Sequence, residues 1–142
     1  MKIVFDTSFI ISLERGNKES HDLVKELFFR EADFFISTIT VSEIMTGVYL
    51  KENFRKSFEL AKDLLSQFIW KDFDSEIAIK SGEIIAFLLT KGERIEFQDV
   101  AIASTALKLN SDYLVTENKK HFERIPALKS KVFSSKELLK KI

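Results

Sequence analysis

Short apolar runs alternate with longer segments of helical periodicity along this chain, and that alternation constrains the fold more than any other feature. The first run, KIVF at 2–5, ends at Asp6 and precedes two helical segments, 7–14 and 18–31. The second run, DFFIS at 33–37, is also followed by helical segments. Strands separated by helices favour a parallel α/β sheet, because each crossover returns the chain to the same edge of the sheet.

The remaining sequence continues this pattern. Further helices are expected at 40–51, 53–68, 75–91, 97–109 and 134–141, and further strands at 69–73, 112–116 and 131–133. Gly92 is expected to end one helix as its C-terminal cap, and Ser134 with Glu137 to open the last helix as a capping box. Without an internal repeat or a linker, residues 1–142 are expected to form one domain.

Composition excludes several classes of site. The absence of cysteine removes disulfides, zinc–thiolate sites and thiol catalysis, and it fits a reducing compartment such as the cytoplasm, where we expect the protein. No run of 18 apolar residues occurs, so no membrane association is expected. Asp6 interrupts the apolar N-terminus, which favours a strand over a targeting segment. Lys+Arg and Asp+Glu each total 22, so contact with a nucleic acid would require a local basic patch.

Acidic residues follow the predicted strands in a pattern typical of a metal site. Ligands of parallel sheets bind at the carboxyl ends of strands where strand order reverses, an edge that would collect Asp6, residues 37–43 and residues 116–118. Asp99 opens an alanine-rich helix. Carboxylates gathered in one cleft repel one another and raise each other's pKa unless a cation is present. Mg²⁺ and Mn²⁺ prefer such oxygen ligands, so Asp6, Glu43 and Asp99 are candidate ligands.

Each candidate also has a simpler structural interpretation. Asp is a favoured N-cap, so Asp6 is equally a candidate cap for the helix that follows it. Glu43 matches a capping box with Thr40. Asp99 suits the positive end of a helix dipole, and Asn118 is typical of a turn. The metal hypothesis therefore depends on the joint occurrence of these residues.

Four segments together resemble the PIN domain, in particular VapC-type toxins: IVFDTS, TVSEI, GERIEFQDVAIASTAL and DYLVTENKKHFERIPAL. The match runs from Met1 to about Leu128, and its specific part is the pattern Gly92, Ile95, Asp99, Ile102, Ala103, followed by Thr116, Asn118 and Phe122. The resemblance implies a three-layer α/β/α sandwich around a central parallel sheet. It also implies a Mg²⁺- or Mn²⁺-dependent endoribonuclease that cleaves RNA, as the toxin of a type II toxin–antitoxin pair with a cognate antitoxin protein as partner.

The same resemblance implies that Asp6, Glu43 and Asp99 are the metal-binding acids. Asn118 would then be a neutral ligand or a water-orienting group. Thr116 would donate a hydrogen bond to a carboxylate or to a phosphate. We count all five among the candidate catalytic residues.

Two positions depart from many relatives, which carry acids where Asn118 and His121 stand. The departure puts a second metal site in question, unless Glu96 or Glu117 compensates; the interpretation of both as solvated charges is favoured. Histidine side chains in general change charge near neutral pH, so His121 is a candidate general base. Because the sequence offers it no partner, we expect a loop histidine or one that contacts phosphate.

Basic and apolar surface residues suggest possible partners. RNA phosphates are expected to meet some of the basic residues near the predicted edge, although a solvated face is an equally good interpretation of each: Lys119, Lys120, Arg124 and Arg94. Apolar pairs and triplets exceed what one small core readily covers, which predicts a homodimer: Phe28–Phe29, Phe34–Phe35 and Val48–Tyr49–Leu50.

Other functions fit the sequence less well. A phosphatase with an aspartyl nucleophile requires Asp-x-Asp after the first strand, where Ser8 stands, and a nucleotide-binding module requires a glycine-rich loop there. A catalytically inactive RNA-binding or scaffold module remains an alternative, although the chain keeps all three acids. A housekeeping RNA-processing nuclease is the nearest alternative to a toxin. The small single-domain length favours the toxin.

Overall fold

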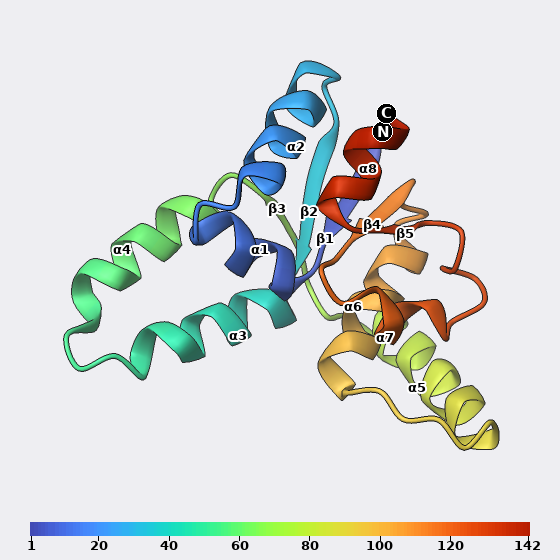
Figure 1. The fold of residues 1–142 in the computed structure, drawn as a ribbon. Coiled ribbons are helices and arrows are strands. Elements are labelled where there is room, and N and C mark those ends of the chain that lie inside the picture. The colour runs from blue at the N-terminus through green and yellow to red at the C-terminus, as the bar shows by residue number, and fades with distance from the viewer.

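Helices cover both sides of a central sheet in the computed structural model, which describes residues 1–142 (Figure 1). Five strands alternate with eight helices along the chain. In order, they are β1 (Lys2–Phe5), α1 (Thr7–Glu14), α2 (Lys18–Phe29), β2 (Asp33–Ser37), α3 (Thr38–Tyr49), α4 (Phe54–Leu65), β3 (Ile69–Lys71), α5 (Ser75–Thr90), α6 (Phe97–Lys108), β4 (Tyr113–Val115), α7 (Lys119–Glu123), β5 (Val132–Phe133) and α8 (Ser135–Lys141).

All strand pairings are parallel, in the order β3-β2-β1-β4-β5. Val4 in the central strand β1 pairs with Phe35 of β2 on one side and with Leu114 of β4 on the other. The chain builds the sheet outward from β1 to β3 and then returns to the other side of β1 with β4 and β5. Strand order therefore reverses beside β1, and the carboxyl end of β1 is where such a sheet leaves a crevice.

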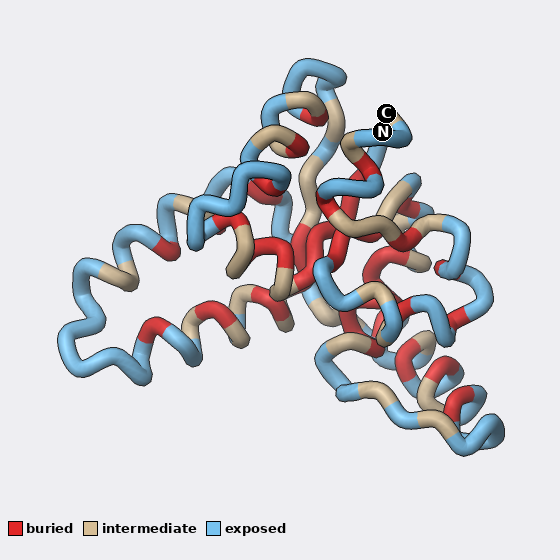
Figure 2. The backbone as a smooth tube through the Cα atoms, in the orientation of Figure 1, coloured by how far each residue is buried: buried red, intermediate tan, exposed pale blue.

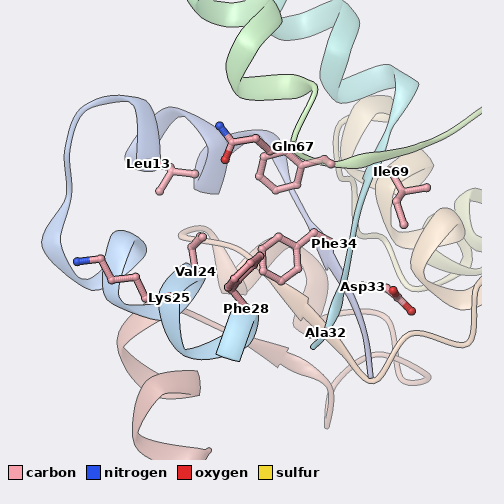
Figure 3. Close-up of a pocket in the computed structure, with 10 residues that line it drawn as sticks. Leu13, Val24, Lys25, Phe28, Ala32, Asp33, Phe34, Gln67 and Ile69 are labelled. Carbon is pink, nitrogen blue, oxygen red and sulfur yellow. The ribbon is translucent and has the colours of Figure 1, made fainter. Parts of the chain in front are cut away.

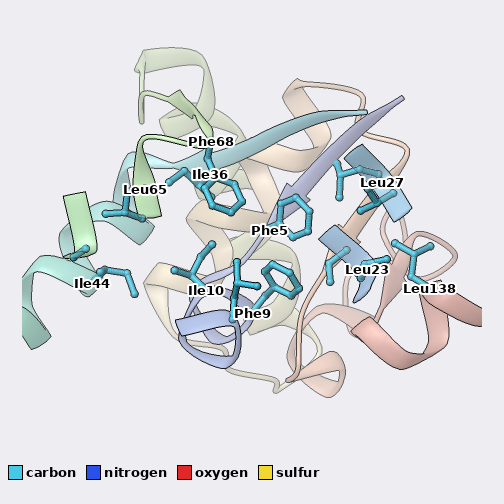
Figure 4. Packing of buried hydrophobic residues seen from close by; sticks show 14 of the residues in the cluster. Phe5, Phe9, Ile10, Leu23, Leu27, Ile36, Ile44, Leu65, Phe68 and Leu138 are labelled. Atoms are coloured by element: carbon cyan, nitrogen blue, oxygen red, sulfur yellow. The ribbon is translucent and has the colours of Figure 1, made fainter. Parts of the chain in front are cut away.

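The predicted three-layer sandwich is confirmed. Two hydrophobic clusters fill the spaces between the sheet and the helices on its two faces. Ile3 and Phe5 of β1 belong to a cluster with residues of α1, α2, α3, α4 and α8. Figure 4 shows Phe5 within this cluster. Val4, on the opposite face of the same strand, packs in a second cluster with α5, α6 and α7. Side chains alternate between the two faces of a strand, so one buried strand supplies both cores. Figure 2 shows the buried residues concentrated along the sheet and the inner sides of the helices.

Helix ends follow their capping residues. Ser134 and Glu137 form the predicted capping box at the start of α8, where each side chain bonds to the backbone of the other residue. Gly92 adopts a φ of 67°, left-handed backbone that a residue without Cβ enters easily, just after α5 ends. At the end of α2, Glu31 takes up a φ of 55°, so this helix ends at Phe29 and does not reach residue 31 as predicted.

Several other predicted boundaries were wrong. Helix α3 begins at Thr38, two residues before the predicted start, because the Ser37 hydroxyl accepts a hydrogen bond from the backbone of Ile39 and acts as the cap. Strands β3, β4 and β5 are shorter than predicted. The short helix α7 was not predicted, since five residues are too few for a periodic signal. No helix is both long and apolar enough to cross a bilayer.

Candidate active site at the carboxyl edge of the sheet

Asp6 ends β1 and begins the turn into α1. Its Oδ1 accepts hydrogen bonds from the backbone N–H of Phe9 at 3.0 Å and from Ser8 Oγ at 2.7 Å. Only 3% of the residue is exposed. The interpretation of Asp6 as an N-cap is therefore confirmed, and the second carboxylate oxygen remains available to another part of the chain.

Thr116, which follows β4, takes that second oxygen. Its fully buried hydroxyl donates to Oδ2 of Asp6 at 2.5 Å and accepts a hydrogen bond from the N–H of Asn118 at 2.9 Å. A phosphate has no access to this hydroxyl, whose proton is already shared with Asp6. Thr116 was expected to donate a hydrogen bond either to a carboxylate or to a phosphate. Its surroundings allow the bond to a carboxylate, and this hydrogen bond joins the ends of β1 and β4.

Burial makes the Asp6 carboxylate difficult to ionise. Desolvation raises the pKa of Asp6 from 3.8 to about 6, although hydrogen bonds from Thr116, Ser8 and the Phe9 backbone lower it. The negative charge of Asp99 raises this pKa further. The ionised form of Asp6 thus lacks a positive partner, and a bound cation is one way to supply it.

Glu43 reaches the same edge from α3. Its Oε1 accepts a hydrogen bond from Thr7 Oγ1 at 2.7 Å, and the Thr7 hydroxyl also lies 3.1 Å from Thr40 Oγ1. The capping-box alternative for Glu43 and Thr40 is wrong, because Ser37 caps α3 and the Glu43 side chain bonds to α1 instead. Thr7, which holds Glu43, directly precedes Ser8, which holds Asp6.

Asp99 lies in the first turn of α6, where the helix dipole favours a negative charge. Its Oδ2 is 2.9 Å from Nδ1 of His121. The two side chains are 20% and 44% exposed, respectively. The prediction of His121 as a loop residue was wrong: it lies in α7, and Asp99 is the partner that the sequence did not reveal. The contact links α6 to α7 at the edge of the sheet.

The remaining candidates near β4 differ in whether another part of the protein already binds their side chains. Asn118 is exposed at the N-cap position of α7, and its side chain makes no capping hydrogen bond. Glu117 turns away from Asp6, since its Oε1 accepts a hydrogen bond from Ser135 Oγ at 2.6 Å. Glu117 therefore holds α8, whereas Glu96 is exposed at the start of α6.

The three predicted ligands occupy one edge of the sheet but do not converge. No group of three or more His, Asp or Glu side chains lies close enough to hold a metal ion. Asp6 is held by hydroxyl and backbone donors, Glu43 by Thr7, and Asp99 by His121. The donor set suits a hard divalent cation in its chemistry.

The basic residues near this edge divide into engaged and available ones. Lys119 is paired with Glu137 at 3.0 Å and with Glu123 at 3.5 Å, which leaves little of its charge for a phosphate. The Arg124 guanidinium donates to the backbone carbonyl of Arg94 at 2.7 Å, so these two exposed arginines are neighbours. Lys120 is exposed on α7.

Sequence reasoning missed the hydroxyl residues that position the acids. Thr7 and Ser8 each bond to one of the carboxylates, and the backbone N–H of Glu117 donates to Ser8 Oγ at 3.0 Å. Two hydroxyl residues directly after a strand-ending aspartate were a usable signal.

Comparison with known proteins identifies this arrangement. The family model described as PIN domain matches residues 3–128. The chain belongs to the PIN domain family. A VapC ribonuclease from Pyrococcus furiosus is 30% identical over 122 residues, which cover 85% of this chain and 77% of that protein. The tRNA(fMet)-specific endonuclease VapC of Salmonella typhimurium is 29% identical over 130 residues, covering 91% of this chain and 96% of its own.

A solved structure gives the same relationship. The structure of VapBC2 from Rickettsia felis, bound to a DNA fragment from its promoter, contains a chain that matches this one with a TM-score of 0.85. The identity is 26%, and the match covers 94% of this chain and 98% of that chain. The predicted resemblance to VapC-type PIN domains is thus confirmed over most of the length.

Proposed function

We propose that this PIN domain is a divalent-metal-dependent endoribonuclease and the toxin of a type II toxin–antitoxin pair. One observation carries the proposal: Asp6 lies buried at the reversal point of the sheet, with a raised pKa, and Asp99 is close enough to raise that pKa further. A desolvated carboxylate beside a second negative charge is unfavourable unless a cation binds there. The named VapC relatives support RNA as the substrate.

Asp6, Glu43 and Asp99 would hold Mg²⁺ or Mn²⁺. When bound, such a cation lowers the pKa of a coordinated water and neutralises charge that develops on the phosphate. Asp6 is the fixed member, because Thr116, Ser8 and the Phe9 backbone set its orientation. Thr116 is a positioning residue. Glu43 and Asp99 have more freedom, since one neighbouring side chain holds each of them.

Asn118 and the nearby arginines would bind the RNA strand. Asn118 offers an exposed amide that hydrogen-bonds a phosphate oxygen or a water without adding charge. Arg94 and Arg124 supply guanidinium groups suited to phosphate, and Lys120 a further charge. Single-stranded RNA is the expected substrate, because a splayed backbone enters a carboxylate crevice more readily than a stacked A-form helix.

An antitoxin is the expected protein partner, with an extended segment lying across the acidic edge. A hollow of about 400 Å³ between α1 and α3 brings the acids Glu14 and Glu43 together with apolar residues such as Val48, and Arg15 and Lys51 also line it. An antitoxin arginine in this hollow would pair with Glu43 and displace or mimic the cation, since guanidinium pairs well with carboxylates. Co-expression with the small DNA-binding protein encoded upstream, if the gene has such a neighbour, tests this by co-purification.

Exposed apolar surface supports a homodimer as well. Phe28 and Phe29 at the end of α2 are 76% and 86% exposed, and Leu50 at the end of α3 is 82% exposed. Figure 3 shows an apolar pocket of about 540 Å³ beside Phe28, lined also by Leu13, Val24 and Phe34. Light scattering at tens of micromolar tests the dimer; a monomer would remove this part of the proposal and leave the nuclease intact.

RNA cleavage is the direct test. A panel of labelled single-stranded and stem–loop RNAs is incubated with the wild type and with Asp99→Asn, in Mn²⁺ and in EDTA. The wild type should cut only with metal, and the variant should not cut. Equal cutting by both proteins would identify a contaminant and refute the assignment.

The separation of the acids keeps one alternative open: an inactive RNA-binding or scaffold module. Each carboxylate already has a hydrogen-bond partner, and no metal cluster is assembled. Thermal melting decides between the two, because a ligand that binds only the folded protein raises its melting temperature. An active nuclease should be stabilised by millimolar Mn²⁺ over EDTA. An inactive module should melt at the same temperature in both. A housekeeping RNA-processing nuclease would also cut RNA as the isolated chain, but it would have no cognate antitoxin that binds it and blocks cleavage.

A further inference from the structure

A small pocket lies beside the proposed active site, and its residue Phe97 has had no role so far. It measures about 350 Å³ and lies against the turn that opens α6. Arg94, Ile95, Glu96, Phe97 and His121 line it. The volume is at the lower end of the range of about 300–1,000 Å³ that is usual for small-molecule sites. His121 belongs to both places, because its Nδ1 contacts Asp99 and its ring lines this pocket.

Phe97 is the unusual member of this pocket. It is 51% exposed although it opens a helix in which every residue from Val100 to Ala106 is buried. Phe73 meets it edge-on, with ring centroids 5.7 Å apart and an angle of 67° between the planes. Such an edge contact orients the Phe97 ring while solvent keeps access to much of it. The result is an oriented aromatic surface two residues from a proposed catalytic acid.

The rim of the pocket carries two arginines that no carboxylate pairs with, and the exposed acid Glu96 also lines the pocket. Arg94 lines the pocket, and Arg124 is tied to the Arg94 carbonyl at 2.7 Å. Neither guanidinium takes part in a salt bridge. An aromatic surface flanked by free cations is how proteins hold single-stranded nucleic acid: the bases stack on the rings and the phosphates meet the cations.

We propose that this pocket is a nucleobase subsite, in which Phe97 stacks on the base of a nucleotide adjacent to the cleaved phosphate. Arg94 and Arg124 contact the phosphates on its side of the strand. The proposal rests on the RNA-cleaving function proposed above and deepens it, since it names a residue that positions the strand. Because every base has a stacking face, the subsite favours unpaired nucleotides over a duplex rather than one particular base.

Binding is measured without metal, so that cleavage does not interfere. Fluorescence anisotropy in EDTA and low salt follows fluorescein-labelled single-stranded RNA on the wild type, Phe97→Ala, Phe97→Leu and Phe97→Tyr. Loss of stacking should weaken binding about 5- to 100-fold in the Ala and Leu variants. Phe97→Leu keeps apolar bulk against Phe73 and so separates stacking from folding. Phe97→Tyr should bind like the wild type.

A control variant lies away from this pocket. Leu60→Ala removes a 60% exposed apolar side chain from α4 and should leave RNA affinity unchanged. An abasic scan sharpens the assignment: with one abasic position in the oligonucleotide, the wild type and Phe97→Ala should bind equally. At every other position the difference between the two proteins should persist.

Several results would overturn the subsite. The first is a wild type that shows no measurable RNA binding. The second is a Phe97→Ala affinity within twofold of the wild type. The third is a loss of RNA affinity in Phe97→Ala that persists at every abasic position. A dimer that becomes a monomer on Phe97→Ala would instead make this surface a contact between two copies. The parent proposal is tested separately by Mn²⁺-dependent cleavage: a wild type that cuts RNA while Phe97→Ala binds normally loses only the subsite, whereas a wild type that cuts no RNA loses the nuclease assignment.

Discussion

Asp6 and Asp99 are both acids at one edge of one sheet, yet their surroundings are opposite. Asp6 is buried behind the end of β1, and donors from α1 and from the residue after β4 hold both of its oxygens. Asp99 is partly exposed in the first turn of α6, and a single contact with His121 orients it. In the proposed metal site, Asp6 is therefore the acid with a fixed orientation, and Asp99 is the acid whose side chain moves to complete the site.

The two acids differ in exposure because they occupy different positions in the secondary structure. A residue at the end of a central strand is surrounded by neighbouring strands and by the helix that begins there, so Asp6 loses most of its water. A residue in the first turn of a helix projects from the edge of that helix, and Asp99 keeps contact with solvent. Desolvation therefore raises the pKa of Asp6 to about 6, while Asp99 contributes its charge from nearby.

The largest expected effect is common to both acids. Asp6→Asn and Asp99→Asn should each lower the RNA cleavage rate by at least about a hundredfold, the usual loss when one preorganised electrostatic group is removed. Rates are compared in single-turnover assays with Mn²⁺. Asp63→Asn, an exposed aspartate on α4, is the matched control and should cleave normally. A loss for one acid alone would end the idea that both serve one site.

Stability against pH should separate the two acids. The folded-state pKa of Asp6, about 6, exceeds its ordinary 3.8, so the folded protein binds the proton more tightly than the unfolded chain. This contribution is fully present below about pH 4 and is lost as the pH rises to 6. Two units of pKa correspond to about 3 kcal/mol of unfolding free energy, which the ionised carboxylate costs the metal-free protein at pH 7.

Asp6→Asn should remove that dependence. Relative to the wild type, the variant should gain up to about 3 kcal/mol in unfolding free energy between pH 4 and pH 7, measured by urea unfolding in EDTA. Asp63→Asn again serves as the control, because no buried charge changes there. If the difference between Asp6→Asn and the wild type stays constant across this range, the burial of Asp6 does not govern its ionisation.

Thr116→Val should have a smaller effect on the same acid. The change keeps the shape of the side chain but removes the donor to Asp6 and the acceptor for the Asn118 N–H. Loss of a buried hydrogen bond destabilises a protein by about 1–3 kcal/mol. The loss should be larger at pH 7 than at pH 4, because the ionised carboxylate depends more on its donor. Thr116→Ser keeps the hydroxyl and should show no such pH difference.

Sequence reasoning predicted the fixed half of the site better than the movable half. The apolar run that ends at Asp6 shows in the sequence that this residue follows a buried strand, and the same holds for Thr116. Parallel strands then place both at one edge, where a hydrogen bond joins them. Their placement depends on strand periodicity, which is a strong local signal.

The contacts of Asp99 and Glu43 depend on side-chain positions that no periodicity encodes. His121 meets Asp99 because a helix of five residues begins after Asn118, and so short a segment leaves no pattern. Thr7 meets Glu43 across 36 residues of sequence. Whether three carboxylates converge on one point is also a matter of rotamers, and the sequence-based ligand set did not anticipate that the side chains lie apart.

The smallest expected effect tests the movable acid directly. If Asp99 must leave His121 to reach a cation, then His121→Ala removes a hydrogen bond that opposes metal binding. The net value of such a bond, about 0.5–1.5 kcal/mol, corresponds to Mn²⁺ affinity that is about 2- to 10-fold higher by isothermal titration calorimetry. His21→Ala on α2 changes the chain's other histidine, which bonds to the Leu13 carbonyl, and should leave the affinity unaltered. Weaker Mn²⁺ binding by His121→Ala would show instead that the imidazole holds Asp99 in its ligand position, so that both acids are fixed before the metal arrives.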